Sequence, residues 1–370
     1  MQTQIRDGER HPFGALRPAA YSQGMETRLY QAVREAVPLV DAAICKLIRL
    51  TGGLRARCAD KRAETALNEF LRTVPVGRGQ YGFNAFMDQY LDSLLVCGNA
   101  IGEIVPAAGG QGIAAVLCGR SESIELREGE SPLDFTICAP DENGKMEALP
   151  YQELLLFTAL HPESAHPYGA SLLRSLPFMA DVLMKIYNTI GVNWERCGNV
   201  RFAVTCKNAD GEAAEQGEVL AREWSRAMQD AKSGSVRDFV AVGDVEVRAI
   251  GADAPILDSA VPVRQITEQL VAKLGIPPFM LGLNWNSTER MSAQQADILT
   301  TEVTAIRRGL TPAAERVCAT WLKMHGYTCG AEVVWDEINL QDQVEEARAA
   351  LYREQARKLK IENDRAEGTV

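Results

Sequence analysis

Two histidines and a glutamate lie close together in the stretch HPESAH, as His161, Glu163 and His166. Imidazole and carboxylate groups are common ligands of zinc and other transition metals, so a metal site is the first chemistry to consider. However, the spacing is not that of a HExxH helix, and Pro162 and Pro167 oppose placing these side chains on one helical face. The stretch therefore favours a loop or helix cap, and we predict no metal site.

The sequence motifs of common enzymes are incomplete or absent. GQGIAA at 110–115 fits GxGxxA, but no helix or acidic ribose ligand follows in the right context, so a hairpin turn is the better interpretation. The chain has no GxxxxGK[ST] phosphate loop and no GxSxG elbow. Asp134, Asp141 and Glu142 gather near a turn at Gly144, where solvated turn residues are expected. We predict no catalytic residue and no cofactor; an enzyme without the usual signatures stays open as an alternative.

The composition indicates a globular protein that does not grip nucleic acid tightly. The chain has 370 residues, 46% of them hydrophobic and 24% charged, which is enough for two or three domains with a sizeable core. Its formal net charge is −10. Tight binding of nucleic acid needs many contacts between basic side chains and phosphates, so this charge disfavours a tight complex but not the loose passage of DNA.

Neither a membrane span nor a disulfide framework is expected. No apolar run reaches the roughly 18 residues that a spanning helix needs. Residues 1–24 are rich in Pro, Gly, Gln and charge, show no signal-peptide pattern, and predict a flexible arm. The nine cysteines form no CxxC pair, which indicates free thiols in a reducing cytoplasm.

The spacing of apolar residues predicts an α+β chain in its first half. Helices are expected at 25–50, which Pro38 should kink or split, and at 82–97. A mostly antiparallel sheet flanked by these helices should occupy 51–160. Its strands are expected at LRARC, AIGEIV, IAAVLC, SIELR and DFTIC, with LLLF as a possible addition.

The second half alternates long helices with short strands. We expect a long helix at 171–197, followed by a compact insert with strands RFAVTCK, FVAV and VEVRAI around a helix at 217–232. A returning helix is expected at 258–274 and another long helix at 292–325. The strand AEVVW and a charged helix at 344–360 complete the pattern. Pro177 marks either a kink or the true start of the first helix. Ser292 is the predicted N-cap of the last long helix, which Gly309 and Pro312 should bend.

Four stretches, in this order, resemble the portal (head-to-tail connector) family of tailed double-stranded DNA bacteriophages. FNAFMDQYLDSLLVCGNAIGEIV is similar to that family's helix that ends in Gly-Asn and runs into a strand. HPYGASLLRSL is similar to the Gly-x-Ser turn before a stem helix, and ITEQLVAKLGIPPFMLGL to the second stem helix with its Pro-Pro exit. SAQQADILTTEVTAIRRGLTPAAERVCATWL is similar to the long helix that follows the tunnel loop. The order of the stretches is more specific than any one of them.

The resemblance implies a division of the chain into the parts of a portal subunit. These are a wing at 25–170 and 292–335, stem helices at 171–199 and 255–276, a clip at 200–254, a tunnel loop at 277–291 and a small helical crown at 336–370. A ring of subunits, usually twelve, would surround an axial DNA channel at one capsid vertex, in a virion assembled in the cytoplasm of a bacterial host.

The resemblance also implies which residues meet DNA. The tip of the tunnel loop would project into the channel and touch passing DNA without holding it; its residues are Asn284, Trp285, Asn286, Ser287, Thr288, Glu289 and Arg290. Packing of Trp285 against its own subunit and a surface salt bridge for Arg290 are equally open. Lys185 and Arg196 on the first stem helix would face either the channel or a neighbour.

The implied partners are those of DNA packaging. They are further copies of the chain, the terminase large subunit, a head-tail adaptor, the major capsid or scaffold protein, and double-stranded DNA bound without sequence preference; no membrane is involved. A non-channel helical scaffold or adaptor of the virion is the alternative. A gene-transfer particle or a domesticated prophage would show the same sequence pattern.

Overall fold

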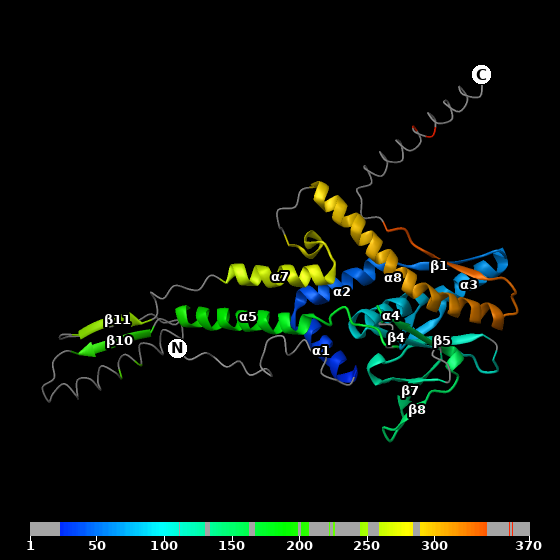
Figure 1. The fold of residues 1–370 in the computed structure, drawn as a ribbon, viewed down its shortest axis with the longest axis horizontal. Helices are drawn as coiled ribbons and strands as arrows, with labels where there is room; N and C mark the ends of the chain where they lie inside the picture. Colours follow the sequence, from blue (N-terminus) through cyan, green and yellow to red (C-terminus); the bar gives the residue numbers. More distant parts are fainter. Residues whose placement is uncertain are drawn as a thin grey trace. The chain divides into compact units, whose positions relative to one another are not determined.

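The computed structural model describes residues 23–110, 112–129, 134–162, 167–198, 201–206, 222, 225, 245–250, 259–283, 289–338, 355 and 357. Helices and strands alternate along the chain, as expected for an α+β protein (Figure 1). The chain divides into two compact units. Unit 1 comprises Met1–Asp181 and Ile266–Val370, and unit 2 comprises Val182–Gln265.

Unit 1 begins with two helices separated at the predicted proline. Helix α1 (Gln23–Ala36) ends before Val37, and α2 (Pro38–Thr51) starts with Pro38 in its first turn. Proline lacks the N–H that an inner helical position must donate, so it fits the start of a helix and interrupts a longer one. Arg34 joins both helices to a third, because its guanidinium contacts Asp41 at 2.7 Å and Asp92 at 2.6 Å. The expected split at Pro38 is confirmed.

A helix that was not among those predicted follows the first strand. Strand β1 (Leu54–Cys58) is the expected LRARC, and α3 (Lys61–Thr73) comes directly after it. The carboxylate of Asp60 accepts a hydrogen bond from the N–H of Arg62, which caps α3. Ala63, Leu67 and Leu71 are buried at four-residue spacing. An N-cap and one apolar stripe are therefore both visible in the sequence. The short hairpin β2 (Pro75–Gly77) and β3 (Gln80–Tyr81) comes next.

The centre of unit 1 contains two small antiparallel sheets where one was expected. The first has the order β5 (Ile113–Cys118), β4 (Asn99–Pro106), β9 (Leu155–Ala159), and α4 (Phe83–Cys97) packs on it. The second has the order β6 (Glu125–Glu128), β7 (Phe135–Pro140), β8 (Met146–Ala148). Ile101 and Leu155 of the first sheet share a buried cluster with Leu126 and Ile137 of the second. Burial of this cluster stabilises an arrangement in which the second sheet packs against the first. It does not favour adding the second set of strands to the edge of the first sheet.

Two turns in this region are the ones expected. Strands β4 and β5 pair antiparallel, and the N–H of Gly110 donates to the carbonyl of Ala107 at 2.9 Å, so GQGIAA begins in a hairpin turn. At the β7–β8 turn, the carboxylate of Asp141 accepts from the N–H groups of Asn143 and Lys145 at 2.8 and 2.7 Å. These hydrogen bonds, led by that of Lys145, lower the pKa of Asp141. Both stretches are turns by their hydrogen bonds.

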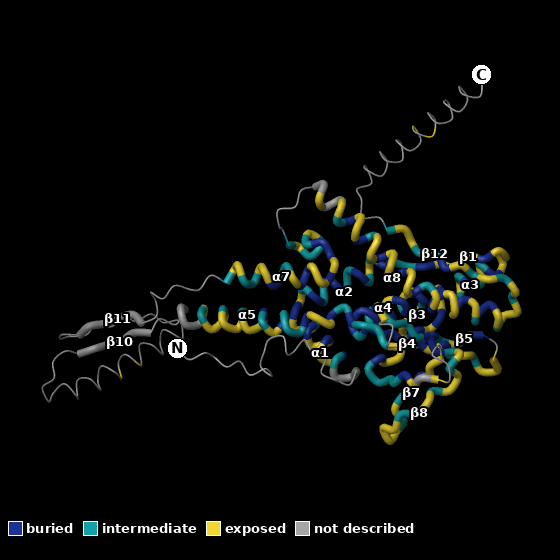
Figure 2. The backbone as a smooth tube through the Cα atoms, in the orientation of Figure 1, coloured by how far each residue is buried: buried dark blue, intermediate teal, exposed yellow. Residues whose placement is uncertain are grey.

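Unit 1 is closed by a long helix and a strand. Helix α8 (Glu289–Met324) has 36 residues, and β12 (Ala331–Trp335) pairs antiparallel with β1. The predicted N-cap at Ser292 is wrong, because α8 already begins at Glu289 and Ser292 lies inside it. Pro312 also lies inside α8 without ending it. Helix α8 is buried along one side (Figure 2) and contacts α2, α3, β12 and β9.

Unit 2 contains parts of two helices and a pair of strands. Helix α5 (Leu176–Gly198) starts beside Pro177, so the predicted start at 171 is too early and Pro177 marks the true start. Strands β10 (Arg201–Cys206) and β11 (Val245–Ile250) pair antiparallel and are the expected RFAVTCK and VEVRAI. Helix α7 (Ala260–Leu274) is the expected returning helix. Four predicted segments lie almost wholly outside the described residues: the arm at 1–24, apart from its last two residues, the strand FVAV, and the helices at 217–232 and 344–360.

The described residues contain neither a disulfide nor a helix suited to a membrane. The cysteines whose side chains are described are free thiols. Burial raises the pKa of the Cys118 and Cys318 thiols to about 12. Among the described helices, none combines the length and apolar character of a membrane span.

Candidate functional site

The predicted tunnel loop begins in a short, well-ordered turn that follows α7. The N–H of Gly275 donates to Val271 and closes α7, and the φ of Gly275 is 68°, a left-handed value that suits glycine. Ile276 is only 2% exposed, so the chain is fixed in the core before it turns. The 3₁₀ helix η5 (Pro278–Leu281) follows, and the N–H of Leu283 donates to the carbonyl of Pro278 at 3.0 Å.

The other side of the loop is the start of α8. Of the seven predicted loop residues, Asn284, Trp285, Asn286, Ser287 and Thr288 lie outside the described residues. Glu289 and Arg290 form the first turn of α8 by their backbone. The structure thus sets both ends of the loop, at η5 and at α8, and the contact of its tip with DNA stays a prediction.

The two stem residues proposed to face the channel lie on α5. Lys185 is exposed, and its side chain or backbone already takes part in an interaction, while Arg196 is described by its backbone alone. Both belong to unit 2, whereas the loop ends belong to unit 1. Whether these residues face a channel stays a prediction. Of the residues first considered as metal ligands, His161 is exposed with a φ of 46°, and Glu163 and His166 lie outside the described residues.

Helix α8 is held in place by an apolar side and one buried cation. Leu299 and Val303, on the first turns after the loop, are 1% and 0% exposed. One turn further along, the guanidinium of Arg307 donates from Nε and one Nη to the carbonyl of Thr51 at 2.9 and 2.7 Å. Thr51 is the last residue of α2, so the cation satisfies a carbonyl at the negative end of a helix dipole.

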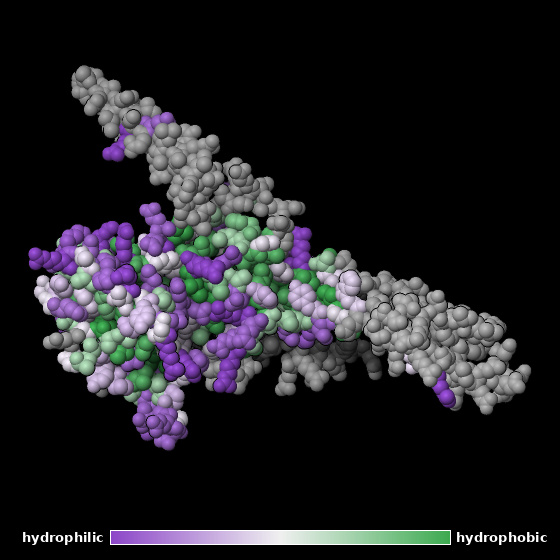
Figure 3. All heavy atoms as spheres, turned by 180° about the vertical axis from the view of Figure 1, so that it is seen from behind, coloured by the Kyte–Doolittle hydropathy of each residue, from purple (hydrophilic) through white to green (hydrophobic). Residues whose placement is uncertain are grey.

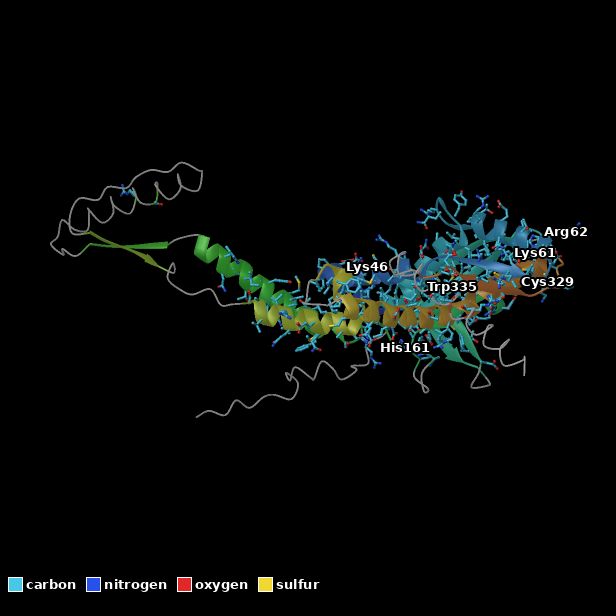
Figure 4. The ribbon with its side chains drawn as sticks, turned by 90° about the horizontal axis from the view of Figure 1, so that it is seen from above. Lys46, Lys61, Arg62, His161, Cys329 and Trp335 are labelled. Carbon is cyan, nitrogen blue, oxygen red and sulfur yellow. The ribbon has the colours of Figure 1, made fainter. Side chains whose placement is uncertain are left out.

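Arg307 has an aromatic partner as well as the carbonyl of Thr51. The indole of Trp335 lies 5.5 Å from the guanidinium carbon, within the range of a cation–π contact, and Trp335 lies along α8 (Figure 4). The indole N–H donates to Thr311 Oγ1 at 3.0 Å. Burial lowers the pKa of Arg307 and Asp336 partly offsets this, but arginine stays protonated at any pH that the protein meets. Arg307 therefore connects α8, α2 and β12 through one charged group.

The root of α5 is formed by two motifs that lie far apart in the sequence. Asn99, at the Gly-Asn end of α4, accepts a hydrogen bond on Oδ1 from the N–H of Gly169 at 2.8 Å. Ser171 donates from Oγ to the carbonyl of Val96 at 2.7 Å, and the same oxygen accepts from the N–H of Leu173 at 3.0 Å. Both side chains are buried. The Gly-Asn and Gly-x-Ser motifs are thus two halves of one contact.

Two glycines make this contact possible because backbone meets backbone there. Gly98 has a φ of 79°, and a Cβ on it would lie 2.6 Å from the nitrogen of Ser171. A Cβ on Gly169 would collide with the carbonyl of Gly98 and with the backbone of Leu160. Sequence reasoning identified both motifs but not their contact, because local spacing carries no information about a pairing across some seventy residues.

These parts describe an α+β chain in which the start of α5 and the loop-bearing helix α8 are both anchored in unit 1. No protein-family model matches the sequence, and no curated protein matches it. Solved structures are similar to it. The neck of a native gene transfer agent (GTA) particle, computed with C12 symmetry, contains a chain that is 15% identical, with 88% of each chain covered and a TM-score of 0.66.

Two further solved structures are similar to the chain to different degrees. A chain from the virion of a native GTA particle is 16% identical, with 89% of this chain and 88% of that chain covered and a TM-score of 0.63. An HK97 family phage portal protein from Corynebacterium diphtheriae is 15% identical, with coverage of 81% and 92% and a TM-score of 0.45. The chain has the fold of a GTA neck protein, which confirms, at the level of the fold, the portal-like resemblance predicted from the sequence.

Replacing Gly169 with alanine should destabilise the protein by about 2–3 kcal/mol or prevent folding, because the added methyl group cannot avoid the backbone of Gly98 and Leu160. The measurement is chemical unfolding followed by circular dichroism. Gly330→Ala is the control, because a Cβ there meets no atom within 4 Å and its φ is not left-handed. Equal stability of the two variants would contradict the proposed role of the contact.

Replacing Arg307 with alanine should lower the free energy of unfolding by about 2–3 kcal/mol, because the buried carbonyl of Thr51 loses both of its donors. Arg308→Ala is the matched control, since the neighbouring Arg308 is exposed and should change stability by less than about 0.5 kcal/mol. Chemical unfolding curves give both values. We call the contacts of Arg307 with Thr51 and Trp335 the Arg307 clamp. If the Arg307 variant loses no more free energy of unfolding than the Arg308 variant, the clamp contributes nothing to stability.

Proposed function

We propose that this protein is a portal protein of a phage or phage-like particle. Copies of the chain would form a ring, twelve in the usual case, at one vertex of the capsid, and double-stranded DNA would pass through its centre. The observation that carries the proposal is the likeness of fold to a neck protein of a particle computed with C12 symmetry, over 88% of both chains. The protein would have no catalytic activity of its own.

The net charge is compatible with a conduit. A strongly basic lining would hold a polyanion in a deep electrostatic well, whereas a protein with a formal net charge of −10 and a few basic side chains lets DNA slide. The segment 284–290 would supply weak contacts with the moving DNA. Its two ends suit this role, since η5 and the buried side of α8 fix them within unit 1.

The remaining roles follow from the position of a portal in the particle. The clip, at 200–254, would bind the terminase large subunit, which hydrolyses ATP during packaging, and afterwards the head-tail adaptor. The wing would contact the capsid or scaffold protein. The protein would be assembled in the host cytoplasm and would end in the virion.

Negative-stain imaging of the purified protein tests the ring. We expect closed rings with a central hole, because a heterologous interface that closes at the right rotation produces a ring and not a dimer. Native mass spectrometry then gives the number of copies. A protein that stays monomeric or dimeric at high concentration would favour the non-channel scaffold or adaptor instead.

Replacing residues 284–290 with a Gly-Ser linker of equal length tests the loop. We expect assembled particles that retain or fill less DNA than the wild type, because the linker keeps the connection between η5 and α8 but removes the side chains at the tip. Packaged DNA is measured per particle. A Gly-Ser replacement of residues 107–111, in the β4–β5 turn, is the control, since the hydrogen bonds described there use backbone groups. Normal filling with the altered loop would remove the loop from the mechanism.

A further inference from the structure

Helix α5 carries three large apolar side chains that are exposed and that recur at the spacing of one helical face. Met184, Tyr187 and Trp194 are 42%, 47% and 65% exposed. With Gly191, they follow each other at intervals of three, four and three residues, which places all four on one side of the helix. Over ten residues at 1.5 Å each, this apolar stripe is about 15 Å long.

The apolar stripe continues a face of α5 that is buried nearer its start. Leu176, Ala180 and Leu183 are at most 4% exposed. Tyr187 and Trp194 follow Ala180 by seven and fourteen residues, close to two and four helical turns, so both lie on the side that is buried earlier. One face of α5 is therefore covered in its first turns and uncovered in its last ones.

Gly191 has no role within its own chain that the described contacts explain. A glycine inside a helix costs about 1 kcal/mol relative to alanine. A Cβ at this position would have no atom within 4 Å, so no packing requirement of the chain excludes a side chain. A glycine in the middle of an apolar stripe lets a second helix approach closely, because no side chain holds the backbones apart.

The chemistry of the stripe suits a protein partner and not DNA. Binding of DNA needs cations directed at phosphates, but the four positions of the stripe are apolar or lack a side chain. Lys185, the basic residue beside Met184, is a full 100° away around the helix. Aromatic side chains such as Tyr187 and Trp194 are enriched where proteins bind each other and bury a large area at low entropic cost.

Helix α8 also carries exposed apolar residues. Met291 and Ile298 on α8 are 48% and 63% exposed and lie seven residues apart, again two turns of one face. On the face that Figure 3 draws, apolar and hydrophilic residues are both present across the described part. A ring joins each subunit to the next through two different faces, so a chain that forms one must carry two such surfaces.

We propose that a second copy of this chain packs against the face of α5 formed by Met184, Tyr187, Gly191 and Trp194. A helix of that copy would contact the backbone of α5 at Gly191. The inference rests on the proposed ring and names one of its contact surfaces. The other possible occupants of the stripe, residues 199–258 of the same chain or a different protein, are distinguished by the experiment.

A photo-crosslinking amino acid in place of Tyr187, in the full-length protein, identifies the occupant. Unlabelled chains that carry the crosslinker are mixed with ¹⁵N-labelled chains, unfolded, refolded together and irradiated. We expect crosslinked peptides that combine both isotopes, which only two separate chains can give. The same residue in place of Thr189, which is exposed on the opposite side of α5, should give at least tenfold less of this product. Crosslinks confined to one isotope, or an equal yield at both positions, would overturn the proposal.

Substituting Gly191 with leucine tests the close approach separately. Leucine has a higher helix propensity than glycine and meets open space in the single chain, so circular dichroism should show an unchanged fold. We expect the ring fraction in mass photometry to fall by about tenfold or more, with Thr189→Leu as the control. Unchanged rings would reject this surface and leave the portal function standing. A wild type that forms no rings would reject the ring, while mixed-isotope crosslinks would still establish the contact.

Discussion

The close backbone contact between the end of α4 and the segment before α5 is the constraint on which unit 1 depends. Gly98 and Gly169 leave no space for a side chain, and Asn99 and Ser171 use their buried polar groups to hold the crossing chains together. Each of these polar atoms has a partner, so burial costs little. The contact sets the position from which α5 starts.

The second support of unit 1 is electrostatic. Arg307 reaches the carbonyl end of α2 and lies over the ring of Trp335, so helix α8 is held near its middle as well as by its apolar side. The pairing of β1 with β12 ties early and late parts of the chain into one ladder. Arg307 thereby fixes the helix that follows the predicted tunnel loop.

Much of this fold could be predicted from the sequence, and the exceptions have physical reasons. Apolar spacing identified α4, α7 and most strands, and Pro38 marked its helix boundary correctly. Helix α3 was missed although Asp60 and the stripe from Ala63 to Leu71 signal it. The division into two sheets, the Asn99–Ser171 contact and the Arg307 clamp depend on residues far apart in the chain, and a single sequence does not show such pairs. The residues proposed to touch DNA were carried over from a resemblance, and their role rests on the proposed function.

The free cysteines of unit 1 differ in how readily they can react with oxidants. A thiol reacts with oxidants through its thiolate, and with a pKa of about 12 only about one in 10⁵ of the Cys118 and Cys318 thiols is ionised at neutral pH. Cys318 is also buried, which keeps dissolved oxidants away from its sulfur atom. An aerated medium would therefore leave the packing around Cys318 unchanged.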